Sequence, residues 1–278
     1  MKHEHNQQAD RSPEPESFPR ALLRQPHGSR QEYFEQQCLI EHPRLLEALE
    51  LIVQTVCPPG EGATRRRPGT MALVIGPARV GKTTLIRAIS GIATVQAGQI
   101  RLNGTVVTGA KPETLVRRGL VQVPQGRLLF GEMSVRENLE MGAFTLRSRK
   151  QLDAALERVH GIFPVLRERG GQAASVLSGG EQQMLALGRA LMGNPACLLL
   201  DEPSLGLAPK VLDQILEIVV RIRASGTPVL VADQNARKVL QISDYSYVLE
   251  NGRIALEGES RRLLHDPAVA ASYLGVQI

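Results

Sequence analysis

Aromatic side chains and cysteines are scarce in this 278-residue chain, and tryptophan is absent. Aromatic residues make up 3% of the sequence, too few for a groove that holds nucleic acid by base stacking. We therefore expect no nucleic-acid partner. The three cysteines are odd in number and form no CxxC pair, which is typical of a reducing compartment. Cys197 is predicted to be a small core residue at the start of a strand.

Long apolar runs are also missing. No segment approaches the roughly 18 apolar residues of a membrane helix, and residues 1–30 contain no apolar signal core. These absences predict a cytosolic protein that reaches a membrane only through a partner. The formal charge of +5 is mild and permits an acidic partner without identifying one. Residues 1–32 have the polar composition of a disordered tail, which leaves 33–278 as the folded domain.

The stretch 177–203, LSGGEQQMLALGRALMGNPACLLLDEP, organises the rest of the chain. Ser178, Gly179 and Gly180 form a small polar turn that precedes apolar residues at helical spacing. Ser178 is a natural N-cap, and the two glycines leave backbone N–H groups uncovered. Such a helix start attracts anions, because its free donors and its dipole both favour negative charge.

The helix leads to a short apolar run, 197–200, which is typical of a buried parallel strand and ends at Asp201 and Glu202. Neighbouring side chains in a strand point to opposite faces, so the two carboxylates cannot share one role. One can hold a hydrated Mg²⁺ and the other can face a water molecule. By themselves the two residues are equally consistent with an ordinary polar strand end.

A second motif lies upstream. The apolar run 71–75 predicts a strand and stops at GPARVGKTT, residues 76–84, which matches GxxxxGK[ST] with a helix expected from Thr84 to about Ile92. The backbone donors of such a loop can surround a phosphate, and Lys82 can reach the outer phosphates. The Thr83 hydroxyl can bind Mg²⁺.

Strand and helix patterns alternate through the remaining chain and indicate an α/β fold. Ser134 and Glu137 resemble a capping box, and Pro209 suits a first helical position. The other predicted elements are weak strands at 38–40 and 49–56, a loop at 58–69 that contains Arg65–Arg67, a strand and turn at 99–107, a helix at 112–118, a strand at 119–124, helical residues 150–168, a strand at 228–232 and a hairpin at 245–256.

From about Ala48 onward, these landmarks resemble the ATP-binding subunits of ABC transporters. They follow the family's order: the phosphate loop at 76–84, Gln125, LSGGE at 177–181, LLLDE at 198–202 and a switch position at 234. The segments VPQGRLLF, ENLEMG and DQNA are most similar to subunits that serve branched-chain amino acid uptake, and VPQGR is also similar to urea importers. The resemblance implies a P-loop NTPase-type core with an antiparallel β subdomain and a helical signature subdomain at about 130–190.

The resemblance also implies an ATP hydrolase at the cytoplasmic face of the membrane, with ATP and Mg²⁺ as cofactors. Two such subunits meet head to tail, so that the turn at 178–180 grips ATP held by the partner. Further partners would be transmembrane permease subunits and, indirectly, a substrate-binding protein. The implied site residues are Glu202, Gln234 and Gln125 for catalysis; Gly76, Gly81, Lys82, Thr83, Thr84, Ser178, Gly179 and Gly180 for the nucleotide; and Thr83, Gln125 and Asp201 for the metal.

Several positions depart from the family pattern. The phosphate loop has Ala78-Arg79-Val80 where relatives usually have Asn-Gly-Ala, and Pro43 falls where an adenine-stacking aromatic is expected. Gln234 replaces the switch histidine of many relatives and cannot take up a proton near neutral pH. Ala208 replaces an aspartate. These changes predict a heterodimer with unequal sites.

Four other functions compete with an importer ATPase for branched-chain amino acids. The altered phosphate loop and the missing aromatic are consistent with a catalytically weak subunit that regulates a more active partner. A urea or other amide importer would carry similar motifs. A DNA-repair or translation ATPase is disfavoured, because neither a long coiled-coil insertion nor a second ATPase module is present. An exporter is disfavoured because no membrane segment is fused to the chain.

Overall fold

A parallel sheet organises the structure, a computed structural model that describes residues 71–76, 81–95, 98–250, 252–267 and 269. The predictions for residues 1–69, which include the tail, the arginine run and Pro43, lie outside the described residues, as do those for 77–80. Within the described part, the main sheet has the strand order β4-β5-β6-β1-β7-β8. The strands are β1 (Met71–Ile75), β4 (Leu120–Val123), β5 (Cys197–Asp201), β6 (Val229–Ala232), β7 (Tyr245–Glu250) and β8 (Arg253–Glu259).

Strands β4, β5, β6, β1 and β7 run parallel, and β8 pairs with β7 in the antiparallel sense at the edge. The central strands β1, β5 and β6 are buried along their whole length, because helices cover both faces of the sheet. The register pairs Val74 and Asp201 with the same residue, Ala232. The carboxyl ends of β1, β5 and β6 therefore meet at one edge, where open parallel sheets bind ligands.

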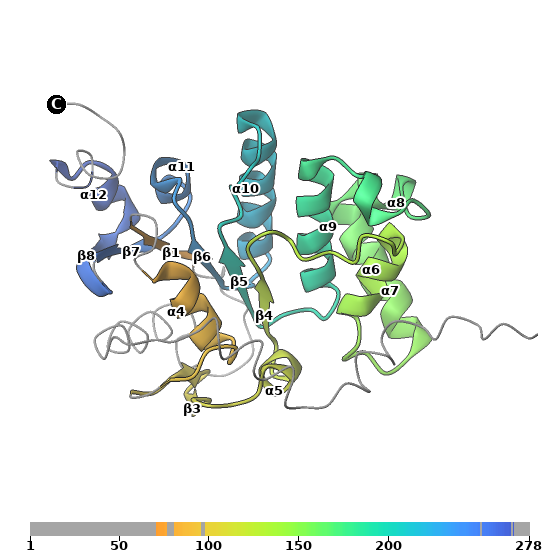
Figure 1. Cartoon of the computed structure of the whole chain (residues 1–278), viewed down its shortest axis with the longest axis horizontal. Coiled ribbons are helices and arrows are strands. Elements are labelled where there is room, and N and C mark those ends of the chain that lie inside the picture. The colour runs from red at the N-terminus through yellow and green to blue at the C-terminus, as the bar shows by residue number, and fades with distance from the viewer. Residues whose placement is uncertain (1–70, 77–80, 96–97, 251, 268, 270–278) are drawn as a thin grey trace, which may run out of the picture. The chain divides into compact units, whose positions relative to one another are not determined.

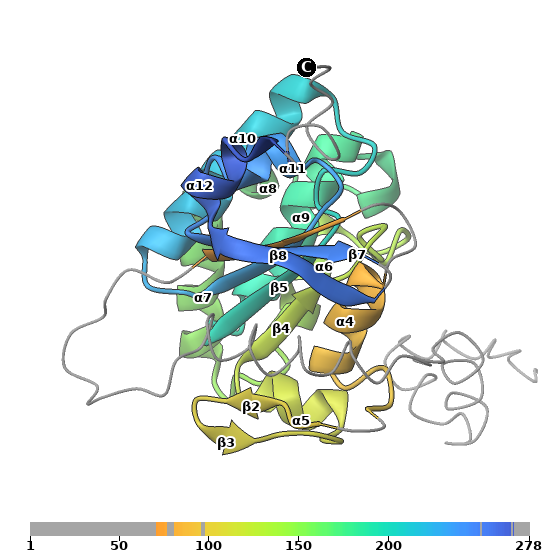
Figure 2. The same cartoon turned by 90° about the vertical axis from the view of Figure 1, so that its left-hand side faces the viewer.

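Helices α4 (Lys82–Ile89), α5 (Pro112–Arg117), α10 (Pro209–Ala224), α11 (Ala236–Leu240) and α12 (Ser260–Leu264) connect or flank these strands. A separate two-stranded sheet, β2 (Arg101–Leu102) with β3 (Thr105–Val106), lies beside α5 (Figures 1 and 2). Its turn has positive φ at Asn103 and Gly104, the backbone that a two-residue hairpin loop requires. Within the described residues, no helix is both long and apolar enough to cross a bilayer.

The helices α6 (Val135–Gly142), α7 (Arg149–Ile162), α8 (Pro164–Glu168) and α9 (Gly179–Leu191), with the short turn η1 (Ala174–Val176), group at one end of the sheet (Figure 1). Glycines allow them to pack closely. A Cβ built on Gly142 would lie 1.9 Å from the Arg189 carbonyl oxygen, and one on Gly188 would lie 3.0 Å from a Leu166 methyl carbon. Only hydrogen fits at the α6–α9 contact.

Most sequence-based elements are confirmed within two or three residues. The capping box at Ser134 and Glu137 is present, Pro209 opens α10, and Cys197 is buried in β5. The continuous helix predicted for 150–168 is wrong. It breaks at Phe163 into α7 and α8, because Pro164 has no N–H to donate and its ring clashes with the preceding turn.

Candidate functional site

The phosphate-loop motif joins the end of β1 to the start of α4. Gly81 is the N-cap of α4 with φ 99°, a left-handed backbone that glycine adopts without strain. The side chain of Lys82 is 4% exposed and donates from Nζ to the Gly76 carbonyl oxygen at 2.6 Å. Burial lowers the pKa of Lys82, against the opposing charges of Glu202, Asp233 and Asp201. Lys82 therefore spans the base of the loop and faces three carboxylates.

Thr83 and Asp201 meet beside this lysine. Thr83 Oγ1 donates to Asp201 Oδ1 at 3.1 Å. Asp201 is 3% exposed, and burial raises its pKa to about 6; Glu202 adds to the shift, while the Thr83 hydrogen bond, Arg87 and Lys82 oppose it. A buried carboxylate at this pKa is poorly compensated by its neighbours.

These donors fit Mg²⁺. A hydroxyl and a carboxylate are hard oxygen ligands, and a magnesium site in an ATPase commonly has one or two protein ligands, with the rest from phosphates and water. The described residues contain no group of three or more His, Cys, Asp or Glu side chains that could hold a metal ion.

Glu202 follows Asp201 but leaves the strand. Its φ is 48°, a left-handed backbone that costs a non-glycine residue about 1–2 kcal/mol. Such strain is a feature of functional sites. The N–H of Glu202 donates to the Ala232 carbonyl oxygen at 2.7 Å. The sequence predicted separate roles for the two carboxylates from strand alternation. In the structure their hydrogen-bond partners differ, and the turn at Glu202 contributes to this separation.

Two glutamines hold the Glu202 carboxylate, one at each oxygen. Gln125 Nε2 donates to Oε2 at 3.2 Å and Gln234 Nε2 donates to Oε1 at 2.8 Å. Since a carboxylate only accepts hydrogen bonds, both amides must present nitrogen to it. Glu202 itself is 8% exposed. Gln125 is thus placed at Glu202, whereas its predicted role as a metal ligand remains a prediction.

Asp233 belongs to this site and was not among the sequence-based candidates. It is fully buried and accepts hydrogen bonds from the Ser204 N–H, the Ser204 hydroxyl and the Asn235 N–H at 3.1, 2.6 and 2.7 Å. These bonds tie the segment after β5 to the segment that carries Gln234. Its position directly after a buried strand, like that of Asp201, is the sequence signal that could have identified it.

The turn at Ser178–Gly180, hereafter the signature turn, has the predicted cap. The Ser178 side chain accepts from the Glu181 N–H, and the Glu181 carboxylate accepts from the Ser178 N–H at 2.9 Å. The hydrogen bonds from Ser178 lower the pKa of Glu181. Ser178 and Gly179 are exposed, and a Cβ on Gly180 would lie 2.5 Å from Val211 Cγ1.

The structure assembles only part of the predicted site. Eight of the predicted residues lie at the carboxyl ends of β1, β4, β5 and β6 or at the start of α4. They are Gly76, Gly81, Lys82, Thr83, Gln125, Asp201, Glu202 and Gln234. Thr84 occupies the first turn of α4. The signature turn lies apart from them, at the start of α9, and α10 stands between α9 and α4 in Figure 1. The two helix starts that the sequence predicts to bind anions are therefore separated within one chain.

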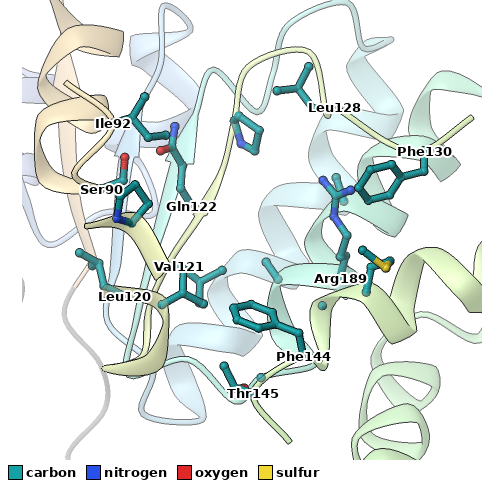
Figure 3. A pocket seen from close by; sticks show the side chains of 18 residues that line it. Ser90, Ile92, Leu120, Val121, Gln122, Leu128, Phe130, Phe144, Thr145 and Arg189 are labelled. Carbon is teal, nitrogen blue, oxygen red and sulfur yellow. The ribbon is translucent and has the colours of Figure 1, made fainter. Parts of the chain in front are cut away.

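A cavity of about 420 Å³ opens between β4 and the helices α6 and α9 (Figure 3). Leu128 and Phe130, from the loop that carries Gln125, line it together with Phe144 of the segment after α6. Arg189 reaches into it toward Phe130 (Figure 3), with its guanidinium carbon 5.5 Å from the ring centroid. Among the described residues that line the cavity, Arg189 alone is charged. Burial lowers its pKa.

Comparison with known proteins places the site in context. Residues 64–205 match the family model described as ABC transporter. Relatives include the high-affinity branched-chain amino acid transport ATP-binding protein BraG of Pseudomonas aeruginosa, 43% identical over 75% of this chain and 89% of the relative. The probable branched-chain amino acid transport ATP-binding protein LivF of Archaeoglobus fulgidus is 36% identical over 76% and 89%. The ADP conformation of MJ1267, an ATP-binding cassette of an ABC transporter, aligns with a TM-score of 0.66 at 30% identity over 74% of this chain and 88% of that one.

Proposed function

This chain belongs to the ABC transporter family, and from that premise we propose that it is the ATP-hydrolysing subunit of a branched-chain amino acid importer. The observation that carries the proposal is Glu202, held by Gln125 and Gln234 next to Lys82 and Asp201. The transported substrate is inferred from BraG and LivF, which are named as branched-chain amino acid transport proteins.

ATP binding would use the loop between Gly76 and Thr84. Lys82 would exchange its bond to the Gly76 carbonyl oxygen for the outer phosphates, whose negative charge a carbonyl dipole cannot match. The start of α4, where Gly81 supplies no side-chain cap, would bind phosphate oxygens through backbone N–H groups and the helix dipole. Thr83 and Asp201 would hold Mg²⁺, with Gln125 as the third predicted ligand. A bound Mg²⁺ supplies positive charge that offsets the charge on the transferring phosphoryl group.

Glu202 would act as the general base. Each of its oxygens already accepts one amide hydrogen bond and keeps a further lone-pair position for a water molecule. The water oxygen would form a bond to the γ-phosphorus as the bond from that phosphorus to the bridging oxygen breaks, and its proton would pass to Glu202. The two glutamines fix the carboxylate and do not take the proton themselves.

The signature turn would serve ATP held by a second ATP-binding subunit. The position of α10 between α9, which begins at this turn, and α4 (Figure 1) supports a head-to-tail dimer in which each subunit completes the other's site. The departures at Ala208, Gln234 and residues 78–80 support a heterodimer, with the partner supplying the more active site. Exposure of Ser178 and Gly179 keeps the turn accessible.

Permease subunits would dock at the cavity of Figure 3, which shares Leu128 and Phe130 with the loop that carries Gln125. Occupation of the cavity would thereby affect the position of Gln125 at Glu202. This contact would hold the chain at the cytoplasmic face of the membrane, and a substrate-binding protein would contribute through the permease. The ATPase domain would begin at residue 33, and its helical subdomain would span about residues 130–190.

Glu202→Gln in the assembled transporter tests the function. We expect ATP turnover at this site to fall roughly 100-fold or more, because an amide cannot accept the proton, while ATP binding is retained. Glu217→Gln, on the exposed face of α10, is the matched control and should leave turnover unchanged. Undiminished turnover in Glu202→Gln removes Glu202 as the base.

A catalytically weak regulatory subunit is the second candidate, favoured by Ala78-Arg79-Val80 in the phosphate loop. ATP affinity of the isolated chain, combined with turnover after mixing with a second ATP-binding subunit, separates the two. Turnover that disappears when only the partner's catalytic glutamate is removed supports the regulatory function. Turnover that persists until Glu202 is also removed supports the importer ATPase with two working sites.

A further inference from the structure

The loop that carries Gln125 contacts helix α9 through the side chain of Arg127, which bonds two glutamines of that helix. We propose that Arg127 is a positioning residue that sets Gln125 against Glu202 according to the position of α9 and its signature turn. The inference rests on the proposed function for its catalytic consequence, whereas the attachment itself can be tested without it. Arg127 is two residues from Gln125, and its guanidinium bonds Gln182 and Gln183 of α9.

The backbone around Arg127 is unusual. Gly126, Arg127 and Leu128 have φ of 76°, 68° and 44°, three successive left-handed residues. Only glycine adopts this conformation without strain, so the two residues after Gly126 are held in it by outside contacts. The hydrogen bonds Arg127 N–H to the Pro124 carbonyl oxygen and Leu128 N–H to the Gly126 carbonyl oxygen, at 3.2 and 2.7 Å, close the turn.

The contacts that hold this backbone come from α9 and involve both the guanidinium and the carbonyl oxygen of Arg127. Its guanidinium donates from Nε to Gln183 Oε1 and from Nη1 to Gln182 Oε1, each at 3.2 Å. Its carbonyl oxygen accepts from Arg189 Nη2 at 3.1 Å. Arg127 is therefore attached to the first and the third turn of α9, and a shift of α9 must move it.

Because Gln183 is buried, the loss of its hydrogen bond to Arg127 would destabilise this contact. Gln183 is 5% exposed, and without Arg127 its amide oxygen would lose its donor in a place that water barely reaches. Gln182 also donates to the Ala174 carbonyl oxygen at 3.3 Å, which ties the segment before the signature turn into the same set. Since both acceptors are neutral amides, the guanidinium can leave them without stranding a buried anion.

The guanidinium also faces the signature turn. A Cβ on Gly179 would lie 3.5 Å from Arg127 Nη2, and one on Gly206 would lie 4.0 Å from it. Within the described part of the chain, Nη2 has no hydrogen-bond partner. An anion bound at the signature turn would thus attract Arg127 away from Gln182 and Gln183, and the change would pass through Gly126 to Gln125.

The first arm of the test uses the isolated chain and amide hydrogen exchange. We expect Arg127→Ala to speed exchange at residues 127 and 128 roughly 10-fold or more, because the turn loses the two side-chain bonds to Gln182 and Gln183 and keeps only the bond from Arg189 to its carbonyl oxygen. Arg136→Ala, which removes an exposed arginine paired only with Glu140, is the control and should leave these amides unchanged. Unchanged exchange in Arg127→Ala overturns the proposal.

The second arm measures ATP turnover of the assembled transporter. Arg127→Ala should lower kcat roughly 10- to 100-fold, the loss that a small misplacement of a catalytic group causes, with KM for ATP changed by less than about 2-fold. Arg127→Lys should recover part of kcat, because an ammonium cannot reproduce the planar fork to two acceptors. Gln183→Leu combined with Arg127→Ala should lower kcat no further than Arg127→Ala alone.

Three results contradict the proposal. A lower melting temperature with unchanged kcat assigns Arg127 a structural role only. Faster exchange with unchanged kcat shows that the attachment does not position Gln125. If the double variant Arg127→Ala, Gln183→Leu loses kcat by the product of the two single losses, Arg127 and Gln183 act separately. If Arg127→Ala does not fold, Arg127→Lys and Gln182→Ala carry both arms. Failure of Glu202→Gln to reduce turnover would contradict the proposed function but leave the exchange arm intact.

Discussion

Asp201 and Glu202 are adjacent in the chain, yet their surroundings differ. Asp201 ends a buried strand with one neutral donor, Thr83, and its pKa is raised by burial. Glu202 has turned off the strand and accepts from two amides. The first arrangement favours a cation, because only added positive charge offsets the desolvated carboxylate. The second fixes a carboxylate and keeps it able to accept from water.

Removal of the Asp201 charge should stabilise the chain without ligands. Burial raises the pKa of Asp201 to about 6, so the folded state holds the extra proton between about pH 4 and pH 6 and loses this contribution as pH rises through that window. At pH 8 we expect Asp201→Asn to raise the unfolding free energy by about 1–3 kcal/mol. Urea unfolding measures this change in unfolding free energy, and Asp153→Asn, at an exposed aspartate, is the control. A decrease would show that the Asp201 carboxylate is compensated in the folded state.

His160 predicts a pH effect of the opposite kind. Burial and the charge of Arg167, with a smaller contribution from Arg136, lower the pKa of His160, while Glu157 opposes the shift. The unfolded chain therefore binds the proton more readily near pH 6, and unfolding free energy should fall as pH drops through 6.5. His160→Asn should flatten this slope in urea unfolding measured from pH 5 to 8. An unchanged slope would show that His160 titrates alike in both states.

Close contact between helices is the critical feature at the scale of elements. Gly142 ends α6 where its Cα hydrogen faces the α9 backbone, and a methyl group would lie 1.9 Å from the Arg189 carbonyl oxygen. Arg189 in turn lines the cavity and holds Arg127. The separation of α6 from α9 therefore sets both the cavity and the position of the loop that carries Gln125.

Gly142→Ala should destabilise the protein by roughly 3 kcal/mol, because the backbone of α9 must move to admit the methyl group. Gly161→Ala is a matched control within α7, since nothing lies within 4 Å of its Cβ position. That change should stabilise by about 0.5–1 kcal/mol through helix propensity. Thermal and urea unfolding give both values. Equal effects of the two substitutions would show that α6 and α9 can separate without cost.

At the scale of the molecule, the signature turn opens α9, and α10 stands between α9 and α4 (Figure 1). Ser178→Arg should therefore prevent association with a second ATP-binding subunit without affecting ATP binding to this chain, because a bulky side chain would fill an exposed anion-binding turn. Size-exclusion chromatography with Glu202→Gln in the background and Mg²⁺–ATP measures association.

Ser148→Arg is the control for this experiment, since Ser148 is also an exposed helix N-cap, at the start of α7. We expect the Glu202→Gln chain to associate in ATP and to remain apart in ADP, with Ser148→Arg unchanged. Association that persists in Ser178→Arg, or that ignores the nucleotide, would contradict the head-to-tail arrangement.

The sequence by itself determined the order of the elements and the caps. Local sequence pattern was sufficient to predict these features, because each depends on neighbours a few residues away. Examples are the apolar runs, the capping boxes at Ser134 and Ser178, and Pro209 at the start of α10. It also placed Lys82, Thr83, Asp201 and Glu202 at strand and helix ends. It failed where local pattern was overridden, as at Pro164, which interrupts the helix predicted for 150–168.

Only the tertiary structure decided which of these ends meet. Parallel pairing of β5, β6 and β1 brings Thr83 to Asp201, and places Glu202 between two glutamines that lie 77 and 32 residues away in the chain. The left-handed backbone at Glu202 and Arg127 and the hydrogen bonds from Ser204 to Asp233 depend on contacts between segments that are distant in the chain. They exist because contacts between distant segments outweigh what each residue prefers on its own.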